Sequence, residues 1–296
     1  MFSIIIPTLN NIEYLKLCIK SIKKNSKFEN HEIIPHVNVG TDGTIEYLKT
    51  NNINYTFTKE NSGICKGMNM AARKSKFDYI LYAHDDFYFC PEWDLVLKDE
   101  INKIGHNNFY LSGTMVNNGQ IDFYCGDSAV NFNENLFLND YKKYNFYDFQ
   151  GSTWSPHLIH KDIWNRVGGL SEEYYPGTGS DPDLNMKLWN SGVRIFKGIN
   201  DFKVYHFGSI TTRRYKNHPN ITTESGSKGG KIFILKWGFS IKFFKKFILK
   251  SDIKYDGPLN EPTKNMKFYL YLLLNKINYF YIKYIYNFKN KHNLSH

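Results

Sequence analysis

Short apolar runs alternate with segments of helical period along the first hundred residues, and this alternation limits the fold more than any other feature of the chain. Residues 3–9, SIIIPTL, form a β-branched apolar run that is typical of a strand buried on both faces in a parallel sheet. Apolar residues then recur at spacings of three and four, at Ile12, Leu15, Ile19 and Ile22, and predict a helix. Strands alternating with helices imply right-handed crossovers, so we predict an α/β fold with a mostly parallel sheet flanked by helices.

The same pattern continues along the chain. We predict strands at residues 31–40, 54–59, 78–83, 193–198 and 202–208, and helices at residues 43–51, 63–75 and 92–104 and within residues 177–192. In the last helix Ser180 or Asp181 is the expected N-cap, and Gly192 ends it. Residues 117–150, rich in Asn, Tyr and Phe, predict irregular structure or short strands, and the polar segment 209–230 predicts a mobile loop.

Two adjacent carboxylates, Asp85 and Asp86, follow directly after the predicted strand at residues 78–83. Adjacent like charges repel, so the pair either lies in a solvated turn or holds a cation. Ligands of open α/β sheets bind at the carboxyl ends of the strands. This position favours a site for Mg²⁺ or Mn²⁺ that also binds substrate phosphates.

A second acidic pair, Asp181 and Asp183, lies at the start of the predicted helix within residues 177–192. An acidic residue there stabilises the helix by capping and through the helix dipole, which is one interpretation. The preceding segment YPGTGS is broken by glycines, so its backbone can approach a ligand and leave a carboxylate projecting into a cleft. The second interpretation is therefore a catalytic base.

Basic residues of the third quarter of the chain have two interpretations as well. His206 is either a hydrogen-bonded core histidine or a metal ligand at the end of a strand. Arg213, Arg214 and Lys216 form a solvated basic patch, or they neutralise a diphosphate if their loop closes over a site.

The four cysteines, Cys18, Cys65, Cys90 and Cys125, are widely spaced and form no C-x-x-C pair. The N-terminus has no secretory leader pattern. We therefore expect free buried thiols and a cytoplasmic protein.

The positive charge is concentrated at the C-terminus. Residues 228–296 carry 14 lysines, no arginine and three acidic residues, a net charge of +11, whereas the whole chain has +10. We therefore predict two parts, a near-neutral domain at residues 1–227 and a basic, aromatic-rich helical extension at residues 228–296.

Three functions are open for this extension. Lysines at 236, 242, 276 and 283 interrupt its apolar runs, so the pattern argues against a membrane-spanning helix. One alternative is a helical subdomain packed on the body of the protein. We favour an anchor at the surface of an anionic membrane, with aromatic side chains at the headgroup level and lysines near anionic lipid. An arginine-free tail without a recognised motif argues against nucleic acid.

Six segments in order, FSIIIPTLN, GTDGT, ENSGICKGMNMA, HDDFYFCP, WNRVGGLSEEYYPGTGSDPDLNMKLWNSGVRIF and YHFGS, resemble a family 2 glycosyltransferase with the GT-A fold. The resemblance covers roughly residues 2–215. It implies a nucleotide-diphosphate sugar as donor, with a UDP-sugar expected, Mn²⁺ or Mg²⁺ as cofactor, and inversion at the anomeric carbon.

The resemblance also implies roles for single residues. Asp85 would contact the ribose or the metal, Asp86 would bind the metal, and Asp181 would be the general base. His206 matches a contact to the metal or the diphosphate. Residues near the nucleobase would be Pro7, Thr8 and Asp42, while Arg213 and Arg214 are expected at the diphosphate.

Two departures from the family pattern stand out. Asn38 and Val39 replace two carboxylates, and Ser180 replaces the Glu before the catalytic Asp. We predict an enzyme that transfers a sugar to a glycan or lipid-linked acceptor in surface polysaccharide or glycoconjugate synthesis, on the cytoplasmic face of a membrane. The alternative is an inactive nucleotide-sugar-binding or scaffolding subunit of a glycan assembly complex.

Overall fold

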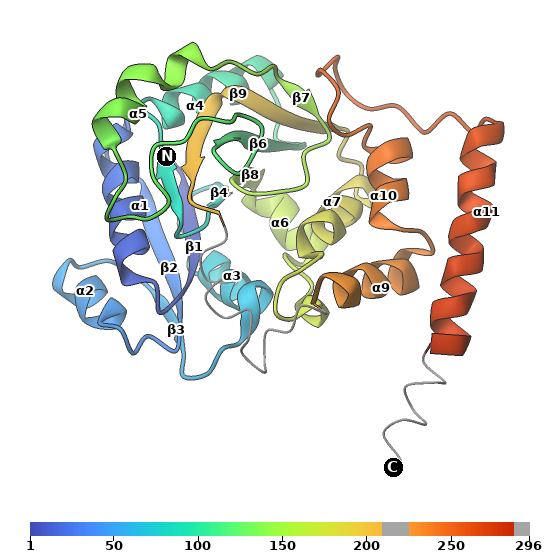
Figure 1. Ribbon diagram of the computed structural model, residues 1–296, viewed down its shortest axis with the longest axis horizontal. Coiled ribbons are helices and arrows are strands. Elements are labelled where there is room, and N and C mark those ends of the chain that lie inside the picture. The colour runs from blue at the N-terminus through green and yellow to red at the C-terminus, as the bar shows by residue number, and fades with distance from the viewer. Residues whose placement is uncertain (209–224, 287–296) are drawn as a thin grey trace.

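A mixed β-sheet runs through the centre of the computed structural model, which describes residues 1–208 and 225–286 (Figure 1). Within this part of the chain the sheet has nine strands. Their order is β3 (Thr56–Thr58), β2 (Glu32–Asn38), β1 (Ser3–Leu9), β4 (Tyr79–Tyr82), β8 (His157–His160), β6 (Phe109–Val116), β9 (Ile195–His206) and β5 (Phe87–Phe89), with β7 (Phe149–Gln150) paired to β9.

Strand direction divides the sheet into two parts. Strands β3, β2, β1 and β4 are parallel, β6 and β9 are parallel to each other, and β8 is antiparallel to both β4 and β6. Two antiparallel steps restore the direction, so β6 and β9 run the same way as β1 and β4. The carboxyl ends of these strands therefore meet at one edge of the sheet, which we call the carboxyl edge.

Helices cover both faces, as the alternation predicts. One face packs against α1 (Ile12–Asn25), α2 (Thr44–Thr50) and α4 (Trp93–Ile104), and the other against α3 (Gly63–Arg73), α6 (Lys161–Val167) and α7 (Ser180–Asn190). Strand β1 shows why. Its side chains alternate between the faces, so Ile4 and Ile6 pack in the core under α1, α2 and α4, and Ile5 packs in the core under α3, α6 and α7; all three are fully buried. Burying each such side chain contributes about 1.5–3 kcal/mol. The predicted α/β class with a mostly parallel sheet is confirmed.

Three details differ from the prediction. Residues 117–150 contain a helix, α5 (Glu134–Asp140), followed by a 3₁₀ turn at Tyr141–Lys143. Asn133 accepts the Leu136 N–H at 2.9 Å and caps α5, and Phe137 is fully buried. Two turns are too short to give a clear periodic signal. The strands predicted at 193–198 and 202–208 are one strand, β9, whose pairing with β6 shifts register.

The third difference lies in the segment predicted as a loop. Residues 209–224 are outside the described residues, but α9 (Ser225–Trp237) already begins at 225. Its glycines suggested a loop, yet Gly229 serves close packing: a Cβ there would lie 2.0 Å from the carbonyl oxygen of Thr178. Helix α9 therefore packs directly on the loop before α7.

The C-terminal region contains α9, α10 (Ile241–Phe243), a π-helical turn η3 (Phe244–Ile248), α11 (Met266–Phe280) and a second π-helical turn η4 (Tyr281–Tyr286). Phe233, Phe244 and Ile248 are buried in the same core as α3 and α7. Main-chain hydrogen bonds join Ile253 to Gln150 and Leu259 to Arg194. The region up to about residue 259 is thus packed on the body.

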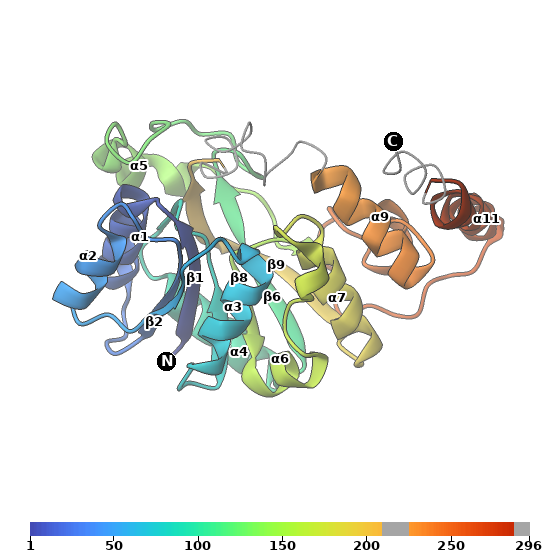
Figure 2. The same ribbon diagram turned by 90° about the horizontal axis from the view of Figure 1, so that it is seen from below.

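Helix α11 is the outermost helix of the molecule (Figure 2). It is held by one side only, where Phe268 and Tyr271 meet the rings of Phe243 and Phe247. None of the helices among residues 1–208 and 225–286 combines the length and the hydropathy needed to cross a bilayer.

Candidate active site

The aspartate pair lies at the carboxyl edge, as its place in the sequence predicts. Strand β4 ends at Tyr82, and Asp85 and Asp86 follow just before β5. Phe87 of β5 pairs with His206 at the end of β9, and the Phe207 N–H bonds to the Asp86 carbonyl at 3.1 Å. This ladder brings together two segments about 120 residues apart in the chain.

The imidazole of His206 faces the Asp86 carboxylate. Its Nε2 lies 3.5 Å from Oδ2 of Asp86, and its Nδ1 lies 3.2 Å from the carbonyl oxygen of Asn118. A carbonyl can only accept, so this bond places a proton on Nδ1, and Nε2 is the ring nitrogen that faces Asp86. Histidines that bind metals usually donate their other ring N–H to a carbonyl or carboxylate in this way.

Both aspartates are buried, with 6% and 3% of their surface exposed. Within the described part of the chain no three His, Cys, Asp or Glu side chains converge as a metal-binding group. Asp86 and His206 therefore fit a cation that takes its remaining ligands from substrate phosphates and water, as Mg²⁺ commonly does. With the described residues as the only ligands, they do not complete the coordination of a cation.

A histidine and a tyrosine connect this pair to Asp181. His84 bonds through Nε2 to the Tyr82 hydroxyl at 2.9 Å, and burial lowers the pKa of His84 to about 4. Burial raises the pKa of the Tyr82 phenol, and the charges of Asp181 and Asp86 raise it further. Tyr82 is therefore close to both carboxylates, which belong to one site.

Asp181 does not cap helix α7, contrary to one of the two predictions. The N-cap is Gly179, with a φ of 89°, and Ser180 donates its hydroxyl to the Gly177 carbonyl at 2.6 Å instead. Residue Asp181 is half-buried, and its Oδ1 is buried without a hydrogen-bond partner among the described residues. Burial raises the pKa of Asp181 to about 7. A carboxylate in this state can accept a proton near neutral pH.

Asp183 has a structural role. It is fully buried, and its carboxylate accepts the Ser171 hydroxyl at 2.6 Å and the Trp237 indole N–H at 2.8 Å. Lys236 pairs with it at 3.0 Å. Of the two acidic residues at the start of α7, only Asp181 is thus available for chemistry.

The residues expected near the nucleobase also lie at the carboxyl edge. Pro7 and Thr8 lie near the carboxyl end of strand β1, which ends at Leu9, and the Thr8 hydroxyl is buried without a described partner. Asp42 is engaged: Oδ2 accepts the Ile12 N–H at 2.9 Å, and Oδ1 accepts the Thr44 N–H and hydroxyl at 3.2 and 2.6 Å. This carboxylate therefore fixes the first turns of α1 and α2, and contact with a nucleobase remains a prediction.

The departure at residue 38 has a structural explanation. Asn38 Oδ1 accepts hydrogen bonds from Thr58 and from the backbone and hydroxyl of Ser62. The amide thus joins the ends of β2 and β3 to the start of α3. Arg213 and Arg214, expected at the diphosphate, lie outside the described residues.

The sequence interpretation missed several residues near these carboxylates: Tyr82 and His84, His157, whose ring centroid lies 4.8 Å from that of Tyr82, and Asn185 in helix α7. His84 directly precedes the aspartate pair, which is a usable signal. Asn185 lies four residues after Asp181, so a helical wheel of α7 would have placed the two on one face. For His157 the only signal is its place in a short strand.

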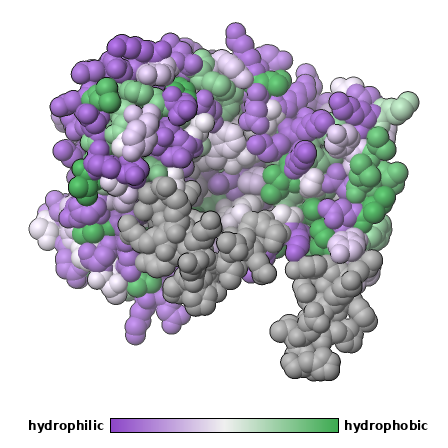
Figure 3. Space-filling model, in the orientation of Figure 1, coloured by the Kyte–Doolittle hydropathy of each residue, from purple (hydrophilic) through white to green (hydrophobic). Residues whose placement is uncertain are grey.

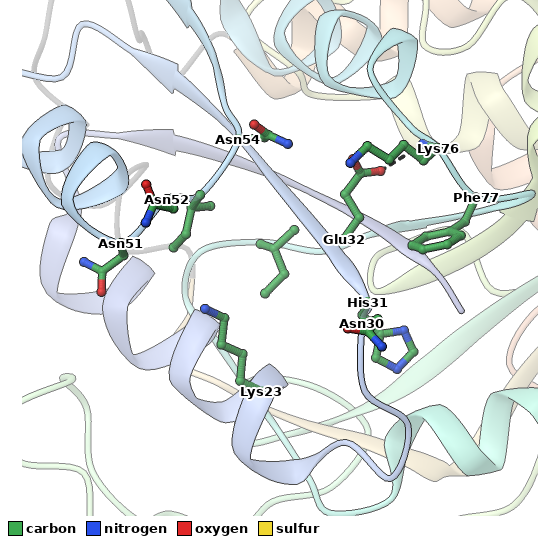
Figure 4. Close-up of a pocket in the computed structure, with 11 residues that line it drawn as sticks. Lys23, Asn30, His31, Glu32, Asn51, Asn52, Asn54, Lys76 and Phe77 are labelled. Atoms are coloured by element: carbon green, nitrogen blue, oxygen red, sulfur yellow. Dashed lines mark hydrogen bonds and ion pairs between the residues drawn. The ribbon is translucent and has the colours of Figure 1, made fainter.

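A separate surface hollow of about 410 Å³ lies at the opposite edge of the sheet (Figure 4). Glu32 there accepts the Lys76 N–H at 2.8 Å, and His31 pairs with Asp94 at 2.9 Å. These groups satisfy one another and lie at the amino ends of β2 and β4, so we assign no function to this hollow.

Comparison with known proteins gives one family match and several fold matches. The family model described as Glycosyl transferase family 2 matches residues 3–163. No curated protein matches the chain in sequence. Residues 1–349 of TarS from S. aureus superpose with a TM-score of 0.55 at 14% identity, over 95% of this chain and 71% of that one.

Two further structures of TarS have the same fold. The 1–349 fragment in complex with UDP-GlcNAc has a TM-score of 0.55 at 14% identity, over 95% of this chain and 72% of that one. A longer TarS chain has a TM-score of 0.53 at 15% identity, and 43% of it is covered.

Proposed function

Because this chain belongs to glycosyl transferase family 2, as its resemblance predicted, we propose that it transfers a sugar from a nucleotide-diphosphate sugar to a hydroxyl of a glycan or lipid-linked acceptor, with inversion. The observation that carries the proposal is the state of Asp181, whose half-buried carboxylate has one oxygen without a partner among the described residues and a pKa raised by burial to about 7. A general base works best when its pKa lies near the working pH.

Asp181 performs the proton transfer in this proposal. The acceptor oxygen attacks the anomeric carbon from the face opposite the nucleotide, and a new glycosidic C–O bond forms. The C–O bond to the nucleotide diphosphate breaks, and the acceptor proton passes to the Asp181 carboxylate. Such a base contributes ~10²–10⁴-fold to the rate.

The opposite end of the site receives the diphosphate. Asp86 and His206 would hold Mn²⁺ or Mg²⁺, and Asp85 would contact the ribose or this cation. When bound, the cation offsets the negative charge that develops on the leaving phosphate. Asn118 fixes the ring of His206, and Asn117 and Asn118 both donate to its carbonyl, so the imidazole is held before the donor arrives.

A uridine diphosphate sugar is our first choice of donor. The structure of TarS in complex with UDP-GlcNAc has the same fold as this chain, which supports this choice. Pro7, Thr8 and Asp42 are proposed near the base, and Arg213 and Arg214 near the diphosphate. The test is calorimetric titration of the whole protein with UDP, GDP, dTDP and CMP, each with and without Mn²⁺. We expect metal-dependent binding of one nucleotide, and binding of none would overturn the proposal.

We also propose that the exposed side of α11 lies on an anionic membrane surface. Eight apolar or aromatic side chains between 49% and 59% exposed gather there (Figure 3); they are Tyr269, Leu270, Leu273, Leu274, Ile277, Phe280, Tyr281 and Tyr284. At 100° per residue they form one stripe, with Lys267 on one flank and Lys276 and Lys283 on the other.

The charged residues around this stripe indicate which kind of surface it contacts. After Glu261 the sequence has no acidic residue and six lysines. An apolar stripe flanked by lysines suits a helix that lies in the plane of an anionic bilayer surface. An enzyme anchored in this way, on the cytoplasmic side, would work beside a lipid-linked acceptor. The division into residues 1–227 and 228–296 also stays a proposal. Because side chains of both parts share one core, removing residues 228–296 would expose that core, so membrane binding is better tested by substitutions on α11.

A further inference from the structure

Several buried polar groups without partners gather beside Asp181. Five side chains on described residues have buried polar atoms that make no hydrogen bond there: Ser112 Oγ, both ring nitrogens of His157, both amide atoms of Asn185, Asp181 Oδ1 and Trp154 Nε1. Leaving one such group unpaired costs about 1–3 kcal/mol. A set of this size in one place indicates a polar site that a ligand or water fills.

The sheet register places three of these residues together. Tyr82, His157 and Ser112 are directly opposite one another on β4, β8 and β6, so their side chains share one face. The ring centroids of Tyr82 and His157 are 4.8 Å apart. Ser112 in turn pairs with Gly198 of β9. The row therefore crosses the sheet on the face that α7 covers.

Helix α7 supplies the facing wall. Asn185 is one helical turn after Asp181, so both project toward the same side. Burial raises the pKa of the Tyr110 phenol, the Asp181 charge raises it further, and the Asn185 amide lowers it. Tyr110 is two residues before Ser112 on β6 and its ring centroid is 4.9 Å from that of His157. The strand row and the helix face thus meet at Tyr110.

Two aromatic rings close the side of this space. Phe149 covers Gly198, where a Cβ would lie 2.1 Å from the ring, and its ring is nearly parallel to that of Trp154, with centroids 6.2 Å apart. The Trp154 carbonyl accepts the Tyr110 hydroxyl at 3.3 Å. Phe149 and Trp154 also line a surface hollow of about 280 Å³. Trp154 is thus shared between this hollow and the group of buried polar side chains.

The chemistry of the set selects its ligand. Apart from Asp181 the set itself contains no charge, because burial lowers the pKa of His157 to about 3 and keeps the ring neutral, with one donor and one acceptor. Lys245 lies over the Trp154 ring, with Nζ 5.0 Å from the centroid, but it is paired with Asp252 at 3.5 Å. A phosphate would need cations, and a metal ion would need more anionic oxygen. Neutral donors and acceptors beside aromatic faces suit the hydroxyls and the C–H face of a sugar ring.

We propose that Ser112, His157, Asn185 and Trp154 form a saccharide subsite that binds the hydroxyls of one pyranose ring next to Asp181. The proposal rests on the proposed function, since the ring is either the glycosyl group of the donor or the sugar of the acceptor. In either case the subsite positions the reacting carbon or hydroxyl against the carboxylate.

Asn185→Leu and Ser112→Ala test the subsite, with Asn25→Leu as matched control. Asn25 is a buried asparagine away from the site, and its amide donates to the Phe89 carbonyl at 2.6 Å. Ser112→Ala breaks no described hydrogen bond, and Asn185→Leu removes at most a contact with the Tyr110 phenol, so we expect both variants to lose less stability than Asn25→Leu. Asn25→Leu should unfold earlier and keep sugar binding.

Two binding measurements distinguish the sources of the ring. Calorimetry compares a nucleotide with its nucleotide sugar, UDP with UDP-GlcNAc first. Saturation-transfer NMR follows free glucose, galactose and N-acetylglucosamine with and without saturating UDP. If the ring belongs to the donor, each variant binds the nucleotide sugar roughly three- to tenfold more weakly and UDP unchanged. If it belongs to the acceptor, nucleotide-sugar affinity stays and the free-sugar signal is lost.

The proposal is overturned if nucleotide-sugar affinity and the free-sugar signals of both variants equal those of wild type, or if both variants lose stability as Asn25→Leu does. Failure of the proposed function has a different signature: wild type then binds no nucleotide at all, while the free-sugar signals still report on the subsite by themselves.

Discussion

The Trp237 indole N–H donates a hydrogen bond of 2.8 Å to Oδ1 of Asp183, only two residues along helix α7 from Asp181. One acidic residue of this turn is thus committed to holding helix α9, while the other keeps a buried oxygen without a described partner. Asp183 therefore stabilises the fold, whereas Asp181 is available for the reaction. The two residues form a matched pair for mutation.

Asp183→Asn should destabilise the protein. The substitution removes the charge that pairs with Lys236 and weakens the bonds from Ser171 and Trp237 in a fully buried position. We expect the free energy of unfolding to fall by about 1–3 kcal/mol, measured by urea denaturation. An unchanged midpoint would contradict the structural role of Asp183.

Asp181→Asn should instead reduce the transfer reaction without destabilising the protein. Transfer should fall by ~10²–10⁴-fold, while affinity for the nucleotide stays the same, because the nucleotide lies at the Asp86 end of the site. A variant that still turns over at the wild-type rate would remove the base assignment.

The same variant should be more stable at neutral pH. The pKa of Asp181 is raised to about 7 by burial, so its ionised form is disfavoured in the folded state. This group therefore reduces stability progressively as pH rises from the unfolded value near 4 to about 7. Asp181→Asn should unfold at a higher temperature above pH 7, with a gain of at most about 4 kcal/mol and less where water reaches the carboxylate. The two proteins should converge near pH 4.

The pH profile of transfer should report the same group. kcat/KM should rise with pH and level off above about 7, as Asp181 loses its proton. Its neighbours Tyr82, Tyr110 and Cys65 stay neutral there, since burial raises the pKa of each. Initial rates measured from pH 5 to 9 test this rise in kcat/KM. A value that does not change with pH would show that another group accepts the proton.

Asp86→Ala and His206→Ala should remove the dependence of nucleotide binding on Mn²⁺. Both side chains meet at 3.5 Å and supply the donors that a bridging cation needs from the protein. Titrations with and without Mn²⁺ should then give the same weak affinity. If either variant keeps the full response to Mn²⁺, that residue is not a ligand.

Liposome flotation tests the α11 face. Replacing Leu270, Leu273 and Leu274 by Asn should abolish binding to vesicles that contain phosphatidylserine. Replacing Lys267, Lys276 and Lys283 by Gln should weaken it by about 1 kcal/mol per lysine near the surface. Vesicles of phosphatidylcholine alone serve as control. Equal flotation of wild type and both variants would exclude this face as the docking surface.

Local patterns predicted most of the fold. Strand β1 and helix α1 follow directly from their apolar spacing, and the position of Asp85 and Asp86 after β4 predicted a site at the carboxyl edge. What local patterns cannot specify is pairing between distant segments. The antiparallel insertion of β8 between β4 and β6 brings His157 beside Tyr82, although 75 residues separate them in the chain.

Side-chain roles depend on partners that the sequence does not show. Asp42 and Asp181 both precede or begin a helix, yet the Asp42 carboxylate accepts the first N–H of two helices, whereas Asp181 makes no such capping bond. The short sequence around each residue gives no sign of this difference. Gly229 shows the same limit, because its role is set by the carbonyl of Thr178 and not by its own neighbours.

The β5–β9 ladder that pairs Phe87 with His206 also sets an order during synthesis. A nascent chain carries Asp86 long before it carries His206, and the two meet only when β9 has left the ribosome and added to the sheet. Until then the growing chain carries Asp86 without the histidine that the proposed cation site needs, so that site can be complete only after most of the sheet has been made.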